Sequence, residues 1–210
     1  MAEDWHSRWE QGRIGWHEAA GNAALRKYWS ALPGKSRVLV PLCGKTLDLL
    51  WLEERSLVVT GVELSPIAAR SFFDENELTF SVCELGEMTI YSGNERNIRI
   101  CCGDYFRFAA ERFDALYDRG ALVAMPPVLR EKYARHTDSL LKPGASRLVV
   151  TLEYEQSVVA GPPYSVKTDE IQQLWPGLRR VSEKDDLANC PPKFREAGLT
   201  EILEVVWITP

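Results

Sequence analysis

The sequence predicts an α/β fold in which a mostly parallel sheet carries helices on both faces. Strand-like apolar runs alternate with helix-like segments along the chain, and Pro-Pro or Pro-Gly pairs mark the connections. At 210 residues, the chain is long enough for one well-buried domain and contains no linker-like stretch. We therefore expect a single domain over residues 1–210, with residues 1–31 as N-terminal helices.

The first half of the chain contains the clearest strand and helix units. These are the strand Arg37–Pro41, the helix Thr46–Arg55 and the strand Leu57–Glu63. Ser65 is expected to cap the next helix, Ile67–Glu75, because a serine hydroxyl accepts from free N–H groups and Pro66 suits a first turn. Two short strands, Thr79–Val82 and Met88–Tyr91, then form an inserted antiparallel excursion.

The second half continues the alternation. The expected strands are Ile98–Cys102, Phe113–Asp118, Ser146–Tyr154, Leu178–Ser182 and Glu201–Thr209. A helix over Leu129–Leu141 should end at the Lys142-Pro143-Gly144 stop signal. Thr168 or Asp169 is expected to cap a further helix that ends at Leu174.

Composition excludes several classes of partner. The net charge of -5 argues against a nucleic-acid or anionic-membrane surface, and no apolar run is long enough to span a bilayer. The N-terminal residues lack the layout of a secretory signal, so we expect a cytoplasmic protein, and we expect a monomer. The five cysteines and three histidines show no ligand spacing, which predicts reduced thiols and no metal. Cys101 and Cys102 should point to opposite faces of one strand.

A glycine turn and an acid identify the candidate ligand site. Gly44 follows the first strand, and Glu63 ends the second strand 19 positions later, where an acid can accept hydrogen bonds from ribose hydroxyls. The turn has one glycine, whereas a dinucleotide site needs G-x-G-x-x-G and a P-loop needs glycine at Leu39. A cofactor with a ribose and no phosphate fits better, which favours S-adenosylmethionine. A plain βαβ turn with an exposed Glu63 is the structural alternative.

Two later strand ends add candidates. Gly103, Asp104 and Tyr105 follow a strand, where the acid and the aromatic ring suit an adenine, although Asp104 could cap a helix and Tyr105 could pack in the core. Asp118 and Arg119 end the next strand. Arg119 could pair with Asp118, bind a cofactor carboxylate, or face an anionic nucleophile.

Aromatic residues gather near the N-terminus. Trp5 and Trp9 are four apart and share one helix face, and Trp16 and His17 follow a glycine-rich bend. An amphipathic helix docked on the domain is one interpretation. The other is a lid whose ring faces cover a sulfonium cofactor, since a ring face attracts cations.

These motifs together resemble the thiopurine S-methyltransferase family, especially its bacterial members. The residues that carry the resemblance are W-x-x-x-W-x-x-G at Trp5–Gly12, Ile14–His17, PLCGK at Pro41–Lys45, GVE at Gly61–Glu63, DRGALVA at Asp118–Ala124 and GPPY at Gly161–Tyr164. The resemblance covers nearly the whole chain. It implies a Rossmann-like class I methyltransferase sheet of seven strands, mostly parallel, with the last strand antiparallel, helices on both faces and an N-terminal helical lid.

The resemblance also implies the site. The cofactor-binding candidates are Trp5, Trp9, Leu42, Gly44, Glu63, Leu64, Gly103, Asp104, Tyr105 and Arg119. Trp16 corresponds to an aromatic position close to the acceptor, and the acceptor candidates are Trp16, Arg119, Lys193 and Arg195. The implied reaction moves a methyl group to the sulfur of a thiopurine or aromatic thiol, with selenium, tellurium or halide acceptors as further options in the family.

Methyl transfer from a sulfonium is an in-line displacement, so the protein mainly aligns the groups and keeps the acceptor anionic. We expect Arg119 to be the catalytic residue that supplies the positive field. The main alternative is a non-catalytic sensor or interaction module that binds S-adenosylmethionine. An NAD-dependent dehydrogenase is disfavoured by the missing glycines, and an RNA methyltransferase by the acidic charge.

Overall fold

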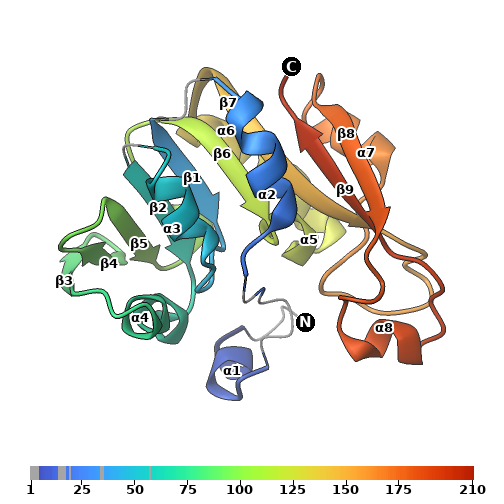
Figure 1. Cartoon of the computed structure of the whole chain (residues 1–210), viewed down its shortest axis with the longest axis horizontal. Helices are drawn as coiled ribbons and strands as arrows, with labels where there is room; N and C mark the ends of the chain where they lie inside the picture. The colour runs from blue at the N-terminus through green and yellow to red at the C-terminus, as the bar shows by residue number, and fades with distance from the viewer. Residues whose placement is uncertain (1–4, 14–17, 19, 34–35, 57) are drawn as a thin grey trace.

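The computed structural model describes residues 5–13, 18, 20–33, 36–56 and 58–210 (Figure 1). Within these residues, nine strands form one sheet in the order β3-β4-β5-β2-β1-β6-β7-β9-β8. The parallel centre of the sheet consists of β5 (Ile98–Cys102), β2 (Val58–Glu63), β1 (Arg37–Pro41), β6 (Phe113–Arg119) and β7 (Leu141–Glu153). Because these strands are parallel, their carboxyl ends lie along one edge of the sheet.

Antiparallel strands extend the sheet at both sides. On one side, β3 (Phe80–Leu85) and β4 (Met88–Gly93) form a hairpin, and β4 pairs with β5. On the other side, β9 (Leu203–Ile208) runs antiparallel between β7 and β8 (Arg179–Asp185). The expected antiparallel last strand is confirmed. The expected number of seven strands is wrong, because the predicted excursion joins the sheet as two further strands, with β4 paired to β5 and β3 at the edge.

Helices cover both faces, as the alternation predicts (Figure 1). Side chains of α2 (Ala23–Tyr28), α3 (Asp48–Glu53) and α4 (Pro66–Glu75) enter one apolar cluster. Side chains of α5 (Ala121–Ala124), α6 (Pro127–Leu140) and α7 (Thr168–Leu174) enter the other. The remaining short helices are α1 (Trp5–Glu10), η1 (Trp29–Ala31), η2 (Tyr105–Arg107) and α8 (Pro192–Glu196). Cys101 and Cys102 belong to different clusters, so the adjacent cysteines face opposite sides of β5 as expected.

Several local predictions can be compared with these helices. Ser65 caps α4 with its hydroxyl 3.4 Å from the Ala68 backbone N, as expected. The helix α6 ends at Leu140, before the predicted stop signal, but β7 begins at Leu141 and includes that signal. The predicted cap of α7 is wrong, because Lys167 precedes the helix and Thr168 is its first residue. In the part of the chain that is described, no helix combines the length and apolar character needed to cross a bilayer.

Candidate active site

A cavity of about 850 Å³ lies where the loops that follow β1, β2, β5 and β6 meet the N-terminal segment and the β8–β9 region. Such a position, at the carboxyl ends of parallel strands, is where open α/β sheets bind ligands. The volume lies within the range of about 300–1,000 Å³ that is common for small-molecule sites. The structure brings the whole predicted cofactor set to this one cavity: Trp5, Trp9, Leu42, Gly44, Glu63, Leu64, Gly103, Asp104, Tyr105 and Arg119 all line it.

The turn after β1 depends on a glycine. Gly44 has a φ of +54°, and a Cβ at this position would lie 3.3 Å from Cζ2 of Trp9. Leu42 also has a positive φ, of 46°, which is uncommon for a residue with a side chain. The tight turn therefore lets the indole of Trp9, a buried residue of α1, approach the backbone closely.

Glu63 connects this turn to the loop after β2. One carboxylate oxygen accepts from the Gly44 backbone N at 2.8 Å, and the other accepts from the Ser65 backbone N at 2.9 Å. The residue is 6% exposed, and burial raises the pKa of Glu63 while these backbone N–H groups oppose the rise. The structural alternative of an exposed Glu63 is therefore wrong. Each oxygen retains a lone pair that a ligand hydroxyl can use.

The loop after β5 combines structural roles with access to the cavity. Asp104 caps η2 by accepting from the Phe106 backbone N at 2.9 Å. Tyr105 packs in the core, and its hydroxyl lies 2.8 Å from that of Thr137. Gly103 sits where a Cβ would lie 2.5 Å from Sδ of Met88. The capping and packing roles are therefore observed, and all three loop residues also line the cavity.

Asp118 and Arg119 separate at the end of β6. The buried Asp118 carboxylate accepts from the Ala121 and Leu122 backbone N atoms and from the Tyr133 hydroxyl, and burial raises its pKa to about 6. Arg119 forms an ion pair with Glu18 instead. The expectation that these neighbours could form an ion pair is thus wrong, since successive strand residues point to opposite faces of the sheet.

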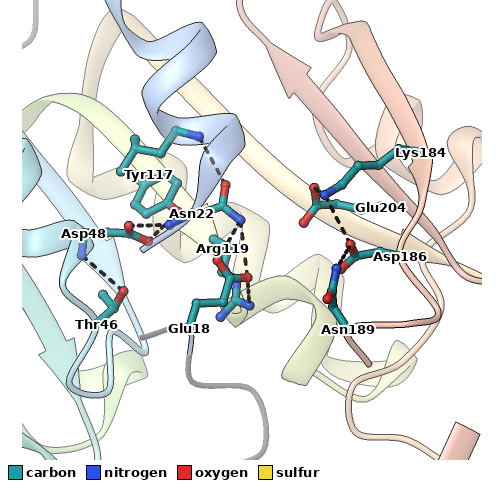
Figure 2. Close-up of polar contacts among 11 residues, drawn as sticks. Glu18, Asn22, Thr46, Asp48, Tyr117, Arg119, Lys184, Asp186, Asn189 and Glu204 are labelled. Carbon is teal, nitrogen blue, oxygen red and sulfur yellow. Dashed lines mark hydrogen bonds and ion pairs between the residues drawn. The ribbon is translucent and has the colours of Figure 1, made fainter. Parts of the chain in front are cut away.

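Residues that follow α1 form a network that was not predicted from the sequence (Figure 2). The buried carboxylate of Asp48 accepts from the Asn22 backbone N and from the Tyr117 hydroxyl, both at 2.8 Å. The Asn22 amide in turn reaches the carboxylate of Glu18 at 3.4 Å. These contacts hold the N-terminal segment against β6 and α3, and so place Glu18 beside Arg119.

A second polar group, also missed, lines the cavity from the β8–β9 side. Lys184 Nζ lies 3.2 Å from Asp186 and 3.5 Å from Glu204, and the Asn189 amide donates to Asp186 at 2.9 Å. Figure 2 shows this group across from the Glu18–Arg119 pair, and both groups line the cavity. The antiparallel direction of the last strand could have indicated this polar group, because that direction brings the start of β9 to the ligand-binding edge.

The predicted acceptor cations Lys193 and Arg195 lie elsewhere. Lys193 Nζ donates to the carbonyls of Ala160 and Pro162 at 3.0 and 2.8 Å. Arg195 donates to the carbonyl of Ala188 at 2.9 Å. Both side chains hold loops, and neither is among the described residues that line the cavity, so the structure does not support an acceptor contact for them. Trp16 lies outside the described residues.

The cavity thus has two chemically different parts. One part is aromatic and apolar and contains the buried acid Glu63, and the other contains the charged side chains of Arg119, Lys184 and their acidic partners. A nucleoside with two ribose hydroxyls fits the first part, since Glu63 can accept from both. The charged part contains both cations and carboxylates and suits a polar small molecule.

Comparisons with known proteins agree with this geometry. The family model described as thiopurine S-methyltransferase matches residues 1–209. The chain is 43% identical to the thiopurine S-methyltransferase of Pseudomonas fluorescens strain Pf0-1, over 98% of this chain and 96% of that protein. It is 44% identical to that of Aliivibrio fischeri strain ATCC 700601 / ES114, over 98% and 97% of the two chains.

A solved structure shows the same fold at low sequence identity. The 1,6-didemethyltoxoflavin-N1-methyltransferase of Burkholderia thailandensis, with bound S-adenosylhomocysteine, superposes with a TM-score of 0.64 and 20% identity. The match covers 99% of this chain and 86% of that one. It supports the class I methyltransferase fold expected from the sequence.

Proposed function

The chain belongs to the thiopurine S-methyltransferase family, and we propose that its cavity holds S-adenosylmethionine in one half and the acceptor in the other. The activity is S-adenosylmethionine-dependent methyl transfer to thiopurine and thiol acceptors. The proposed cofactor half consists of Trp5, Trp9, Leu42, Gly44, Glu63, Leu64, Gly103, Asp104 and Tyr105. The proposed acceptor half consists of Arg119, Lys184, Asp186, Asn189 and Glu204.

Glu63 carries the proposal, because its position fits a ribose and no phosphate. Its carboxylate already binds the backbone N–H groups of Gly44 and Ser65, which would otherwise be available to a pyrophosphate. A negative charge at this point repels phosphate and attracts hydroxyl donors. Glu63 would therefore hold the two ribose hydroxyls through charge-assisted hydrogen bonds.

The adenine would lie beside Gly103, Asp104 and Tyr105. One oxygen of Asp104 caps η2, which leaves the other free to accept from an exocyclic amine. Leu64, whose side chain is 37% exposed, offers an apolar surface to the ring at the same mouth of the cavity. Together these residues would supply both polar recognition and apolar contact.

The two indoles of α1 suit the charged centre of the donor. When bound, S-adenosylmethionine supplies a methyl group that is already activated by the sulfonium charge. Trp5 and Trp9 line the cavity and would attract that charge through their ring faces while excluding water from the reacting centre. Trp9 also covers Gly44, so the lid and the glycine turn close on the same ligand.

Arg119 would act as the catalytic cation at the junction of the two halves. Its guanidinium lies beside Glu18 and lines the same cavity as Cys190 and Glu204. Burial raises the pKa of both of these residues, and the charge of Arg119 partly opposes that rise. A cation at this position would favour the thiolate form of an acceptor and hold it for in-line attack. Sulfur acceptors with an ionisable proton are therefore the substrates that this cavity suits.

Calorimetric titration with S-adenosylmethionine tests the assignment of Glu63. Each charge-assisted hydrogen bond contributes about 1.5–3 kcal/mol. We expect Glu63→Ala to weaken cofactor binding by at least about tenfold. Glu77→Ala, at an exposed glutamate in the turn between α4 and β3, should bind like the wild type. Wild-type affinity in Glu63→Ala would contradict the ribose assignment.

A further inference from the structure

We propose that Glu204 accepts the ring N–H proton of a thiopurine acceptor in its thione form as the methyl group is transferred. This inference rests on the proposed function, because it assumes that the acceptor lies between Arg119 and the β8–β9 side of the cavity. It adds a catalytic group to that arrangement.

The topology brings Glu204 to the reaction edge. β9 runs antiparallel between β7 and β8, so its first residues lie at the carboxyl end of β7. Glu204 is the second residue of β9 and is in register with Leu152 on one side and Lys184 on the other. All three residues line the cavity. A carboxylate on a strand that is paired on both sides is held more rigidly than one on a loop, which suits a group that must meet a substrate proton.

The carboxylate is buried but weakly paired. Glu204 is 7% exposed. Among the described residues, its ion-pair partner is Lys184, whose Nζ lies 3.5 Å from a carboxylate oxygen of Glu204. That distance exceeds the 2.7–3.2 Å of an ordinary N–H···O hydrogen bond. Lys184 lies closer to Asp186, and its side chain is 52% exposed. A buried carboxylate normally has close hydrogen-bond partners. The carboxylate of Glu204 can therefore accept a further hydrogen bond from a donor in the cavity.

The surrounding charges make Glu204 a suitable proton acceptor. Burial raises the pKa of Glu204, and the negative charges of Asp186 and Glu18 raise it further. The positive charges of Lys184 and Arg119 act in the opposite direction. The carboxyl therefore titrates closer to neutral pH than an exposed glutamate, and a base is most efficient when its pKa is near the operating pH.

The proposed step balances for a thione. The acceptor sulfur uses a lone pair to form a bond to the methyl carbon, while the carbon–sulfonium bond breaks and its electron pair stays with the donor sulfur as a neutral thioether. As this bond forms, Glu204 accepts the ring N–H proton, and the N–H bonding pair returns to the ring as the carbon–sulfur double bond becomes single, which leaves a neutral product. Proton removal therefore belongs to the methyl-transfer step, so loss of the base lowers kcat/KM. A thiolate that is already ionised needs no such proton transfer.

This difference between acceptors provides the test. Initial rates would be measured for wild type and Glu204→Gln with mercaptopurine, a thione with ring N–H groups, and with a nitro-substituted aryl thiol that is ionised at the assay pH. With mercaptopurine, we expect kcat/KM of Glu204→Gln to fall about 10²–10⁴-fold, the usual contribution of a general base. With the aryl thiolate, the change should be less than about threefold.

Two controls make the result specific. Glu201→Gln changes an exposed glutamate just before β9 and should match the wild type with both acceptors. The wild-type pH profile with mercaptopurine should show an acid limb that Glu204→Gln lacks and that Glu204→Asp retains. Retained turnover of the aryl thiolate, together with unchanged cofactor affinity, would show that Glu204→Gln is folded.

Three outcomes would overturn the inference. One is wild-type turnover of mercaptopurine by Glu204→Gln, and another is an equal loss with both acceptors. If Glu204→Gln does not fold, a Glu204→Asp variant whose mercaptopurine and aryl thiolate rates change by the same factor relative to wild type would do the same. Failure of the proposed function is distinguishable, because the wild type would then bind S-adenosylmethionine yet methylate neither acceptor.

Discussion

Arg119→Ala is the variant that most directly tests the charged half of the cavity. The guanidinium side chain is 23% exposed, and it stands beside Glu18 while Glu204 and Asp186 lie across the cavity. Without the guanidinium, the remaining cation of this group among the described residues would be Lys184, which pairs with Asp186 and Glu204. At an effective dielectric constant of about 20, the attraction between the guanidinium charge and an acceptor thiolate roughly 5–6 Å away contributes about 3 kcal/mol. We therefore expect kcat/KM for a thiolate acceptor to fall by a factor on the order of 10².

The assay compares Arg119→Ala and Arg119→Lys by the rate of S-adenosylhomocysteine formation across pH. Lysine keeps the charge but not the planar fork, so Arg119→Lys should recover part of the loss. Arg179→Ala, at an exposed arginine of β8, should behave like the wild type. An unchanged kcat/KM in both Arg119 variants would remove this residue from the reaction.

Three further predictions concern other parts of the structure. Burial raises the pKa of Asp118 to about 6, so the folded protein keeps a proton that the unfolded chain releases at lower pH. The free energy of unfolding should therefore fall by roughly 3 kcal/mol between about pH 4 and pH 6, and urea titrations should show a smaller fall for Asp118→Asn. Gly44→Ala adds a Cβ 3.3 Å from Trp9 at a φ of +54°, which should weaken S-adenosylmethionine binding about tenfold by calorimetry. Tyr117→Phe removes the hydroxyl donor of the buried Asp48 and should lower the free energy of unfolding by about 1–3 kcal/mol in urea, and a change below about 0.5 kcal/mol would mean that water replaces it.

The fold was predictable where local pattern and sheet position agree. Arg37–Pro41 and Ile98–Cys102 form strands with the expected bounds, because short apolar β-rich runs between turn residues have few alternatives. The hairpin of β3 and β4 was recognised, but not its pairing with β5. Side chains of β3 are mostly exposed, so the amphipathic pattern that indicates pairing is weak there. Strand partners are a long-range property, and local periodicity does not specify them.

The site was predictable to the extent that the parallel sheet determines it. Gly44, Glu63, Gly103 and Arg119 each follow or end a parallel strand, and all of them line the cavity. Glu18, Asn22 and Asp48 were not predicted, because their contacts join a segment before β1 to residues after the glycine turn. Lys193 and Arg195 were expected at the acceptor, but their side chains bind loop carbonyls, and sequence spacing does not determine the loop conformation on which these hydrogen bonds depend.

The antiparallel last strand explains why the two halves of the cavity differ. Parallel strands deliver only their carboxyl ends to the ligand edge, and in this chain those ends supply backbone turns, Glu63 and Arg119. β9 instead delivers its amino-terminal residues, and its β8 neighbour delivers Lys184 in register with Glu204. Substitutions on this side can therefore change the charge that faces the acceptor while the turns that hold the cofactor stay intact. A fold that binds one donor can in this way adapt to different acceptors through substitutions in β8 and β9, while Arg119 at the end of β6 stays in place.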